Sequence, residues 1–331
     1  MFKYLFLLLL PVFAFSQKTQ EIYLMGTIKD KSNTTKSISV IDLRETKDLG
    51  TVTFKGKQVE FIFPKNDAEI FFNDWFTKFN KEPKGSKKIV LVLEKLQFAN
   101  NTTDDGKNHF TADFRASTFL EKEGQYFFLS RVNNLYKPKQ DFPENPTGIA
   151  LTVTQIFQAL LNKSYTKTPS MVALSKESLS DYETFLVPGL PAIKNTELAS
   201  GIYSDFESFF SQTPLLGYEL IRNANNELKS AKKGEETIPS YKIFAYVEGN
   251  KAYLNTAAGF LELEKDENGF FVTSNEGTLN PAQMNSSYAM FGLIGAGIGA
   301  IETSAKNKAA RKLSTSKIYI DPLSGRYIYG K

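Results

Sequence analysis

Few residues of this chain combine the types and the spacing that chemistry requires. Asp104, Asp105 and Asn108 surround Gly106, and this run resembles a fragment of a calcium loop. It lacks the alternating oxygen ligands and the distal glutamate of an EF-hand. We therefore expect a solvated hairpin loop here, and we predict no metal site.

Histidine and cysteine limit the remaining chemistry. His109 is the one histidine in 331 residues, so a Ser-His-Asp triad would have to use it, and a site built from several histidines is excluded. The chain has 0 cysteines, which excludes disulfides, thiolate nucleophiles and cysteine zinc sites. The motifs of phosphate-binding loops, serine hydrolase elbows and zinc proteases do not occur either. We predict no catalytic residue and no cofactor, and a hydrolase with unidentified carboxylates is the third interpretation.

The least ordinary stretch is an apolar, glycine-rich segment, "FGLIGAGIGAIE", at residues 291–302. On a helix, Gly292, Gly295 and Gly299 would let a partner backbone come close. Each helical glycine costs roughly 0.5 to 1 kcal/mol relative to alanine, so close packing must offset that cost. Three interpretations stay open: packing inside its own domain, docking or self-association in an envelope assembly, and membrane insertion.

A basic cluster follows the glycines. It consists of Lys306, Lys308, Arg311 and Lys312. An apolar segment with such a cluster can rest on an anionic membrane surface, and the alternative is a solvated helix end. We predict an apolar helix over 285–312, and we take the three glycines and four cations as the candidate interaction segment.

The first 16 residues have the pattern of a secretory signal peptide. Lys3 precedes an apolar run over residues 4–13, and Ala14-Phe15-Ser16 suits a signal peptidase. The run is about half of the roughly 20 residues that a bilayer span needs. We expect a mature chain from Gln17, in the periplasm, at the outer membrane or secreted. A lipoprotein is excluded, because no cysteine is present to carry the lipid.

Composition bounds the class of protein. Lys+Arg 40 against Asp+Glu 36 gives a net charge of +4, which argues against a dedicated nucleic-acid binder. The hydrophobic content of 41%, with 28 Phe and 15 Tyr, suffices for two cores. We predict an α+β fold with two domains, each an antiparallel sheet backed by a few helices.

The predicted first domain covers residues 17–165. Alternating patterns predict strands at 21–28, 37–43, 51–54, 59–63, 87–100, 109–122 and 124–136, of which the last three form a meander. Two amphipathic helices are expected, at 66–79 and 145–164. Asn66 is the expected N-cap of the first helix, and Trp75 is an expected core anchor.

The rest of the chain divides into a linker and a β-rich domain. We expect a linker at 166–200, with a short helix, and a second domain at 201–331. Ser204 is the expected cap of a short helix there. Gly249-Asn250 predicts a two-residue hairpin turn, and "DPLSG" predicts the turn of a last hairpin.

Two resemblances accompany these patterns. The order of strands, helix, three strands and helix resembles, at fold level, periplasmic modules of transport-associated envelope lipoproteins. The opening "GIY..F..F", the hairpin with Gly-Asn-Lys and the late Gly/Ala-rich segment are similar to a group of uncharacterised secreted proteins of Gram-negative envelopes, over residues 201–331. The resemblances imply an envelope location and transfer no activity.

We therefore interpret the chain as an exported, non-catalytic binding or assembly component of the bacterial cell envelope. The alternative is a peripheral membrane or transport-accessory factor that uses the glycine-rich segment. The partner is unknown, and an envelope protein or a membrane surface is the candidate.

Overall fold

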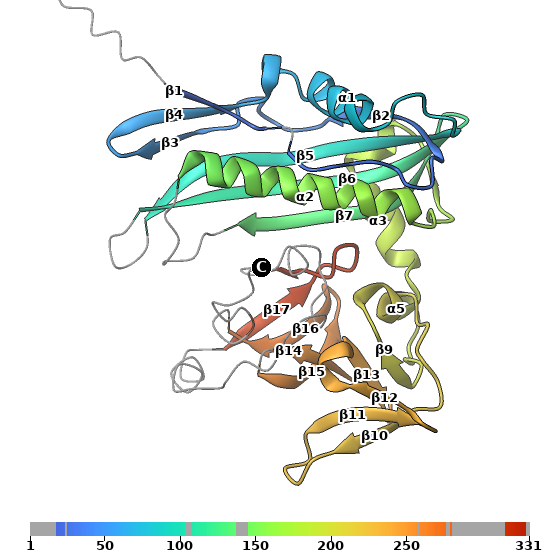
Figure 1. Cartoon of the computed structure of the whole chain (residues 1–331). Coiled ribbons are helices and arrows are strands. Elements are labelled where there is room, and N and C mark those ends of the chain that lie inside the picture. The colour runs from blue at the N-terminus through green and yellow to red at the C-terminus, as the bar shows by residue number, and fades with distance from the viewer. Residues whose placement is uncertain are drawn as a thin grey trace, which may run out of the picture.

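The structure is a computed structural model that describes residues 18–23, 25–102, 108–136, 145–256, 258–275, 279 and 315–328. Within these ranges, strands form four sheets and a small number of helices pack against them (Figure 1). The predicted α+β class is confirmed.

The largest feature of the N-terminal half is a five-stranded sheet, the first sheet, with the order β2-β5-β6-β7-β8. Its strands are β2 (Thr35–Asp42), β5 (Lys87–Thr102), β6 (Asn108–Lys122), β7 (Gln125–Tyr136) and β8 (Ala173–Leu174). The expected meander is β5, β6 and β7, which pair antiparallel. β2 instead pairs parallel with β5. The chain between β2 and β5 includes a helix, and such a crossover is what allows two strands to run parallel.

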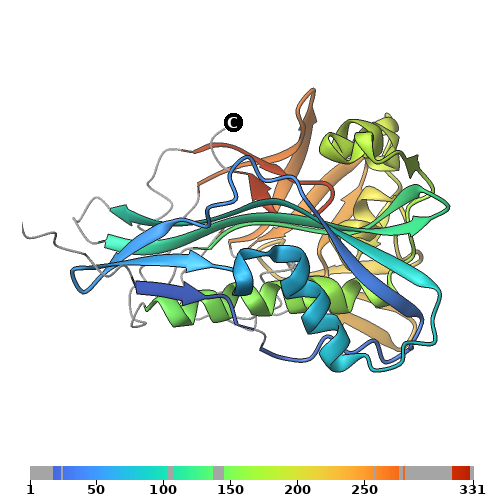
Figure 2. The ribbon, with the colours of Figure 1, turned by 90° about the horizontal axis from the view of Figure 1, so that it is seen from above.

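Two helices cover one face of the first sheet, as the view from above shows (Figure 2). They are α1 (Ala68–Phe79) and α2 (Pro146–Thr166). The N-cap of α1 is Asp67, whose carboxylate accepts from the Ile70 N–H at 3.0 Å, so the prediction of Asn66 was wrong by one residue. Asn66 has a φ of +55°, whereas an N-cap needs the extended conformation that Asp67 adopts.

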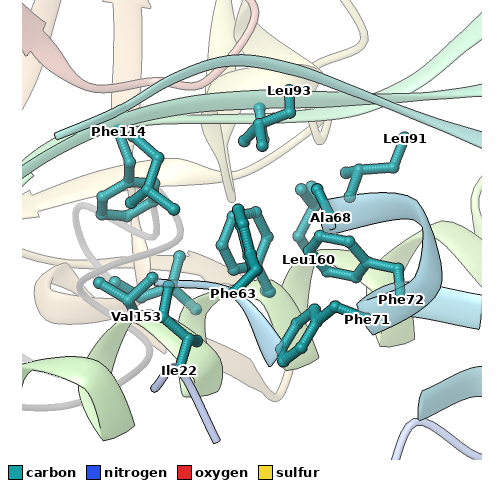
Figure 3. Packing of buried hydrophobic residues seen from close by; sticks show 14 of the residues in the cluster. Ile22, Phe63, Ala68, Phe71, Phe72, Leu91, Leu93, Phe114, Val153 and Leu160 are labelled. Atoms are coloured by element: carbon teal, nitrogen blue, oxygen red, sulfur yellow. The ribbon is translucent and has the colours of Figure 1, made fainter. Parts of the chain in front are cut away.

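The main core lies between these helices and the first sheet. Phe71, Phe72 and Trp75 of α1 belong to it, and Figure 3 shows Phe71 and Phe72 among the packed side chains. Phe72 also packs edge-on against Phe157 of α2. Trp75 is fully buried, and its indole N–H donates to the carbonyl of Gly26 at 3.1 Å. The expected role of Trp75 as a core anchor is confirmed.

A small sheet, β1-β4-β3, lies beside this core. Its strands are β1 (Lys18–Glu21), β3 (Thr51–Phe54) and β4 (Lys57–Ile62), followed by the short helix η1 (Pro64–Asn66). The strand expected at 21–28 does not form. The carbonyls of Gly26, Thr27 and Ile28 accept instead from side chains of α1 and α2, among them Trp75 and Tyr165. These side chains satisfy the backbone without a ladder.

The C-terminal half contains a seven-stranded sheet, the second sheet, with the order β18-β17-β16-β15-β14-β13-β9. Its strands are β9 (Gly201–Tyr203), β13 (Ala245–Glu248), β14 (Lys251–Thr256), β15 (Gly259–Asp266), β16 (Gly269–Ser274), β17 (Ser316–Ile320) and β18 (Tyr327–Ile328). Gly249 and Asn250, with φ of +58° and +62°, make the predicted two-residue turn. The turn predicted between the last two strands is also confirmed.

Short elements pack on both faces of the second sheet. They are α4 (Pro191–Lys194), α5 (Phe206–Phe210) and η4 (Ser240–Lys242), with a three-stranded sheet of β10 (Glu219–Arg222), β11 (Leu228–Lys233) and β12 (Glu236–Pro239). α5 is capped by Asp205 in a capping box with Ser208, so the prediction of Ser204 was wrong. Asp205 is the residue in the extended conformation that places a side-chain oxygen over the Ser208 N–H.

The segment 166–200 contains β8, η2 (Glu177–Ser180), α3 (Tyr182–Leu186), η3 (Val187–Gly189) and α4. β8 pairs with β7, and Leu179, Tyr182 and Leu186 pack on the face of the first sheet opposite α1 and α2. We use "first unit" for residues 18–187 and "second unit" for residues 201–328. The predicted domain boundaries stay a prediction.

The cap of α5 gives a direct test of these assignments. Replacing Asp205 with alanine removes the oxygen that accepts from the Ser208 N–H at 2.7 Å, and we expect the free energy of unfolding to fall by about 1 kcal/mol. The control, Ser204→Ala, should change it by less than about 0.5 kcal/mol. Urea unfolding followed by circular dichroism measures both, and equal losses would contradict the cap assignment.

Candidate functional site

The residues that the sequence singled out lie outside the part of the chain that the structure describes. These residues are Gly292, Gly295, Gly299, Lys306, Lys308, Arg311 and Lys312, together with the expected helix at 285–312. Asp104 and Asp105 also lie outside it, and His109 is described only as a backbone position of β6. The interaction segment therefore stays a prediction.

A different group of ionisable side chains converges on the face of the first sheet opposite α1 and α2. We call it the charged cluster. It consists of Glu94, Arg115, Ser117, Arg131, Asn133, Tyr182, Glu183 and Asp321. The first sheet, α3 and the turn after β17 all contribute to it, so positions up to 227 residues apart in the sequence meet here, from Glu94 to Asp321.

Glu94 lies on this face at a β-bulge in β5. The register between β5 and β6 shifts between Leu93 and Lys95, so two residues of β5 oppose one of β6. Leu93 and Leu96 both belong to the core under the helices, which regular alternation would not allow for residues three apart. Glu94 lies between them and turns to the other face, where it meets Ser117 of β6.

Glu94, Ser117 and Tyr182 form a closed triangle of oxygen atoms. Glu94 Oε1 lies 2.7 Å from Ser117 Oγ and 3.0 Å from Tyr182 Oη, and the two hydroxyl oxygens lie 2.5 Å apart. Two hydroxyls supply only two protons for three contacts, so a proton on Glu94 completes the triangle. In agreement, burial raises the pKa of Glu94, although Arg131, Ser117, Tyr182 and Arg115 oppose the rise.

Arg131 is the buried cation of the cluster, with a side chain 1% exposed. Its Nη2 donates to Glu183 Oε1 at 2.7 Å, and its Nη1 lies 3.5 Å from Asp321 Oδ2. The guanidinium also lies 5.7 Å from the centre of the Tyr182 ring. Burial opposes the charge, but the neighbouring acids, Asp321 foremost, hold the pKa of Arg131 above its ordinary value.

Asp321 brings the second unit into the cluster. Its side chain is 3% exposed, and Oδ2 accepts from Asn133 Nδ2 of β7 at 3.2 Å. Oδ1 accepts from the Leu323 N–H at 2.9 Å, which fixes the turn that follows β17. The same carboxylate therefore shapes its own turn and pairs with the first sheet.

The part of the cluster that contains the hydroxyl of Ser117 is closed to solvent. Ser117 is fully buried and Tyr182 is 2% exposed. Only the side chains of Arg115 and Glu183, 41% and 44% exposed, give the cluster substantial contact with water. A substrate cannot reach Ser117 in this conformation, so the arrangement serves to join elements of the chain.

A depression lies elsewhere, on the second unit beside the end of α4. It has a volume of 320 Å³, and Lys251, Glu262, Lys265 and Phe270 are among its lining residues. Lys265 Nζ donates to the carbonyls of Ala192 and Ile193 at 3.0 and 2.6 Å. Lys251 and Glu262, which also line the depression, pair with each other at 3.0 Å.

The described ranges contain neither a metal-binding group nor a membrane-spanning helix. Those residues hold no group of three or more His, Cys, Asp and Glu side chains that could bind a metal ion. None of the described helices is long and apolar enough to cross a membrane.

Comparison with known proteins adds no assignment. No family model, no curated protein and no solved structure matches this chain. The resemblances drawn from the sequence therefore stay predictions.

Sequence reasoning missed the charged cluster. A signal was present in β5, where Glu94 directly follows the continuous apolar run "IVLVL", because a carboxylate at the end of a buried strand needs partners. Nothing in the sequence alone pairs Arg131 with Asp321, 190 positions apart. From the sequence, Asp321 is only the first residue of a predicted turn.

The protonation of Glu94 makes stability depend on pH. A carboxyl whose pKa is raised on folding contributes stability below its unfolded pKa, and this contribution is lost as pH rises through the folded pKa. Glu94→Gln keeps the neutral form at every pH. We expect the free energy of unfolding of the variant to match that of the wild type near pH 4 and to exceed it at pH 8. Each unit by which a pKa shifts on folding corresponds to about 1.4 kcal/mol. Urea unfolding across this range measures the difference, and a pH-independent difference would contradict the assignment.

The pair of Arg131 and Asp321 gives a second test. Arg131→Met leaves the carboxylate of Asp321 buried beside Asn133 without its cation, and we expect a loss of about 3 kcal/mol in the free energy of unfolding. In the double variant Arg131→Met/Asp321→Asn, at least about 1 kcal/mol of this loss should return, because the unpaired charge is removed. A double-mutant cycle by chemical unfolding measures the coupling, and strict additivity would rule it out.

Proposed function

We propose that this chain is an exported, non-catalytic binding or assembly component of the bacterial cell envelope. One observation carries the non-catalytic part of the proposal. Within the described residues, the ionisable groups converge in the charged cluster. Its central side chains are closed to solvent, namely Ser117, Tyr182 and Arg131. Their contacts join three parts of the chain. A catalytic nucleophile must instead meet its substrate.

The export part of the proposal rests on the first 16 residues, whose cation, apolar run and small residues follow the pattern of a signal peptide. The envelope part rests on the resemblance over residues 201–331. Large apolar side chains also stand on the described surface, with Met171 99% exposed and Leu216 64% exposed. Such side chains are available to a partner, although single exposed apolar residues are common.

The alternative function is a peripheral membrane or transport-accessory role for the candidate interaction segment. Its support is the sequence of Lys306, Lys308, Arg311 and Lys312 after an uncharged stretch. Cations near an anionic surface contribute on the order of 1 kcal/mol each, so four of them would give salt-sensitive attachment.

Fractionation of cells that produce the full chain tests both functions. We expect a mature N-terminus at Gln17 and recovery in the periplasmic or outer-membrane fraction. Full-length protein in the cytoplasm would contradict the export proposal. Release from membranes by high salt would favour the peripheral alternative.

Two variants refine this test. Replacing Lys306, Lys308, Arg311 and Lys312 by glutamine should abolish salt-sensitive attachment if the cations hold the membrane. The variant Gly295→Leu/Gly299→Leu should detach a docked protein while leaving its far-ultraviolet circular dichroism unchanged. If it unfolds the protein instead, the glycines belong to a core.

A further inference from the structure

The second unit contacts the first unit through two carboxylates. Asp321 meets Arg131 and Asn133 of β7, as described above. Glu207, in the first turn of α5, meets Lys163 and Lys167 at the end of α2. Lys163 Nζ lies 2.9 Å from Glu207 Oε1, and Lys167 pairs with Oε2 of the same carboxylate. Figure 1 shows the second unit below β7, with the turn after β17 directed toward the first sheet.

Acid and cation are distributed between the two units in the same way at both contacts. The acid comes from the second unit each time, and the cations come from the first unit. Arg131 is buried, with a side chain 1% exposed, and the two lysines are partly exposed, at 28% each. Arg131 has almost no contact with water in the docked state, so its contact depends most strongly on the charge of the acid.

Apolar packing across this junction is small. Among the described residues, Leu323 is the one side chain of the second unit in the buried cluster with Val90, Val92 and Phe119. Leu190, in the connection between the units, packs against both this cluster and the core of the second unit. Within the described ranges no strand of one unit pairs with a strand of the other. Ion pairs with few shared apolar clusters are typical of interfaces between units that move relative to each other.

We propose that the junction between the two units is a charge-dependent clasp, in which Asp321 and Glu207 hold the units together and their neutralisation lets the units separate. Opening moves the turn with Leu323 away from the first sheet and exposes the apolar strip of Val90, Val92 and Phe119. The clasp does not depend on the proposed export of the protein.

The groups that face Glu207 set the direction of its response to pH. Glu207 is faced by Lys163 and Lys167 of α2. Burial opposes its ionisation, but the two lysines outweigh burial and lower its pKa, so its contribution to docking is present above its ordinary pKa and is lost as pH falls through the lowered value.

Asp321 is faced by Arg131 and Asn133 of β7, and through Arg131 by Glu183 of α3. Glu94 of β5 and Arg115 of β6 complete the surroundings. Because the pKa of Glu94 is raised, Glu94 takes up its proton before Glu207 does on acidification. That step completes the triangle with Ser117 and Tyr182 inside the first unit, so it does not open the clasp.

The variant Asp321→Asn/Glu207→Gln imitates the neutral clasp at neutral pH. Its matched control is Glu183→Gln/Glu262→Gln, which removes the same two charges. Glu183 pairs with Arg131 from within the first unit, and Glu262 pairs with Lys251 within the second. Small-angle X-ray scattering should give a larger radius of gyration for the clasp variant than for the wild type, and an unchanged one for the control. Equal radii for all three proteins would overturn the proposal.

Hydrogen exchange supplies a second measurement on the same proteins. In the clasp variant, protection of the Leu323 and Gly325 amides should fall at least tenfold while that of β5 is kept. If the clasp variant fails to fold, the wild type is followed by scattering and circular dichroism as pH is lowered. Expansion before loss of secondary structure supports the clasp, and simultaneous loss of both overturns it.

Discussion

The arrangement of this protein depends on a buried guanidinium. Arg131 projects from β7 on the face of the first sheet opposite α1 and α2, with almost no contact with water. A charge in that position is tolerated only if carboxylates surround it. Glu183 from α3 and Asp321 from the turn after β17 supply them. The need to compensate one cation therefore fixes where a short helix and a distant turn lie.

The strand β5 explains why that face has to be covered. Residues 89–93 are buried on both faces, which requires apolar cover on two sides. The main helices cover one side with an aromatic core, and residues of 174–187 with Leu323 cover the other. Where the apolar part of this second face ends, the charged cluster begins. The first sheet thus has an aromatic core on one face and a partly ionic junction on the other.

Local patterns predicted most of the fold. The aromatic period of α1, the three long strands and the Gly249-Asn250 turn follow from contacts a few residues apart, and all three were confirmed. The sequence did not reveal the parallel pairing of β2, which the crossover between β2 and β5 allows. It did not reveal the irregular backbone at 26–28 either, because side chains of the helices bond its carbonyls. The charged cluster was missed for the same reason. The predicted interaction segment lies outside the described residues.

The pairing of Arg131 with Asp321 holds the turn after β17 to the first sheet. Amide hydrogen exchange of the wild type tests it most directly, at the N–H groups of Leu323 and Gly325, which both bond to Asp321. If the turn is clamped by Arg131, these amides are strongly protected relative to their intrinsic exchange rates. If they exchange as fast as an exposed turn while β5 stays protected, the buried pair does not hold the two units together.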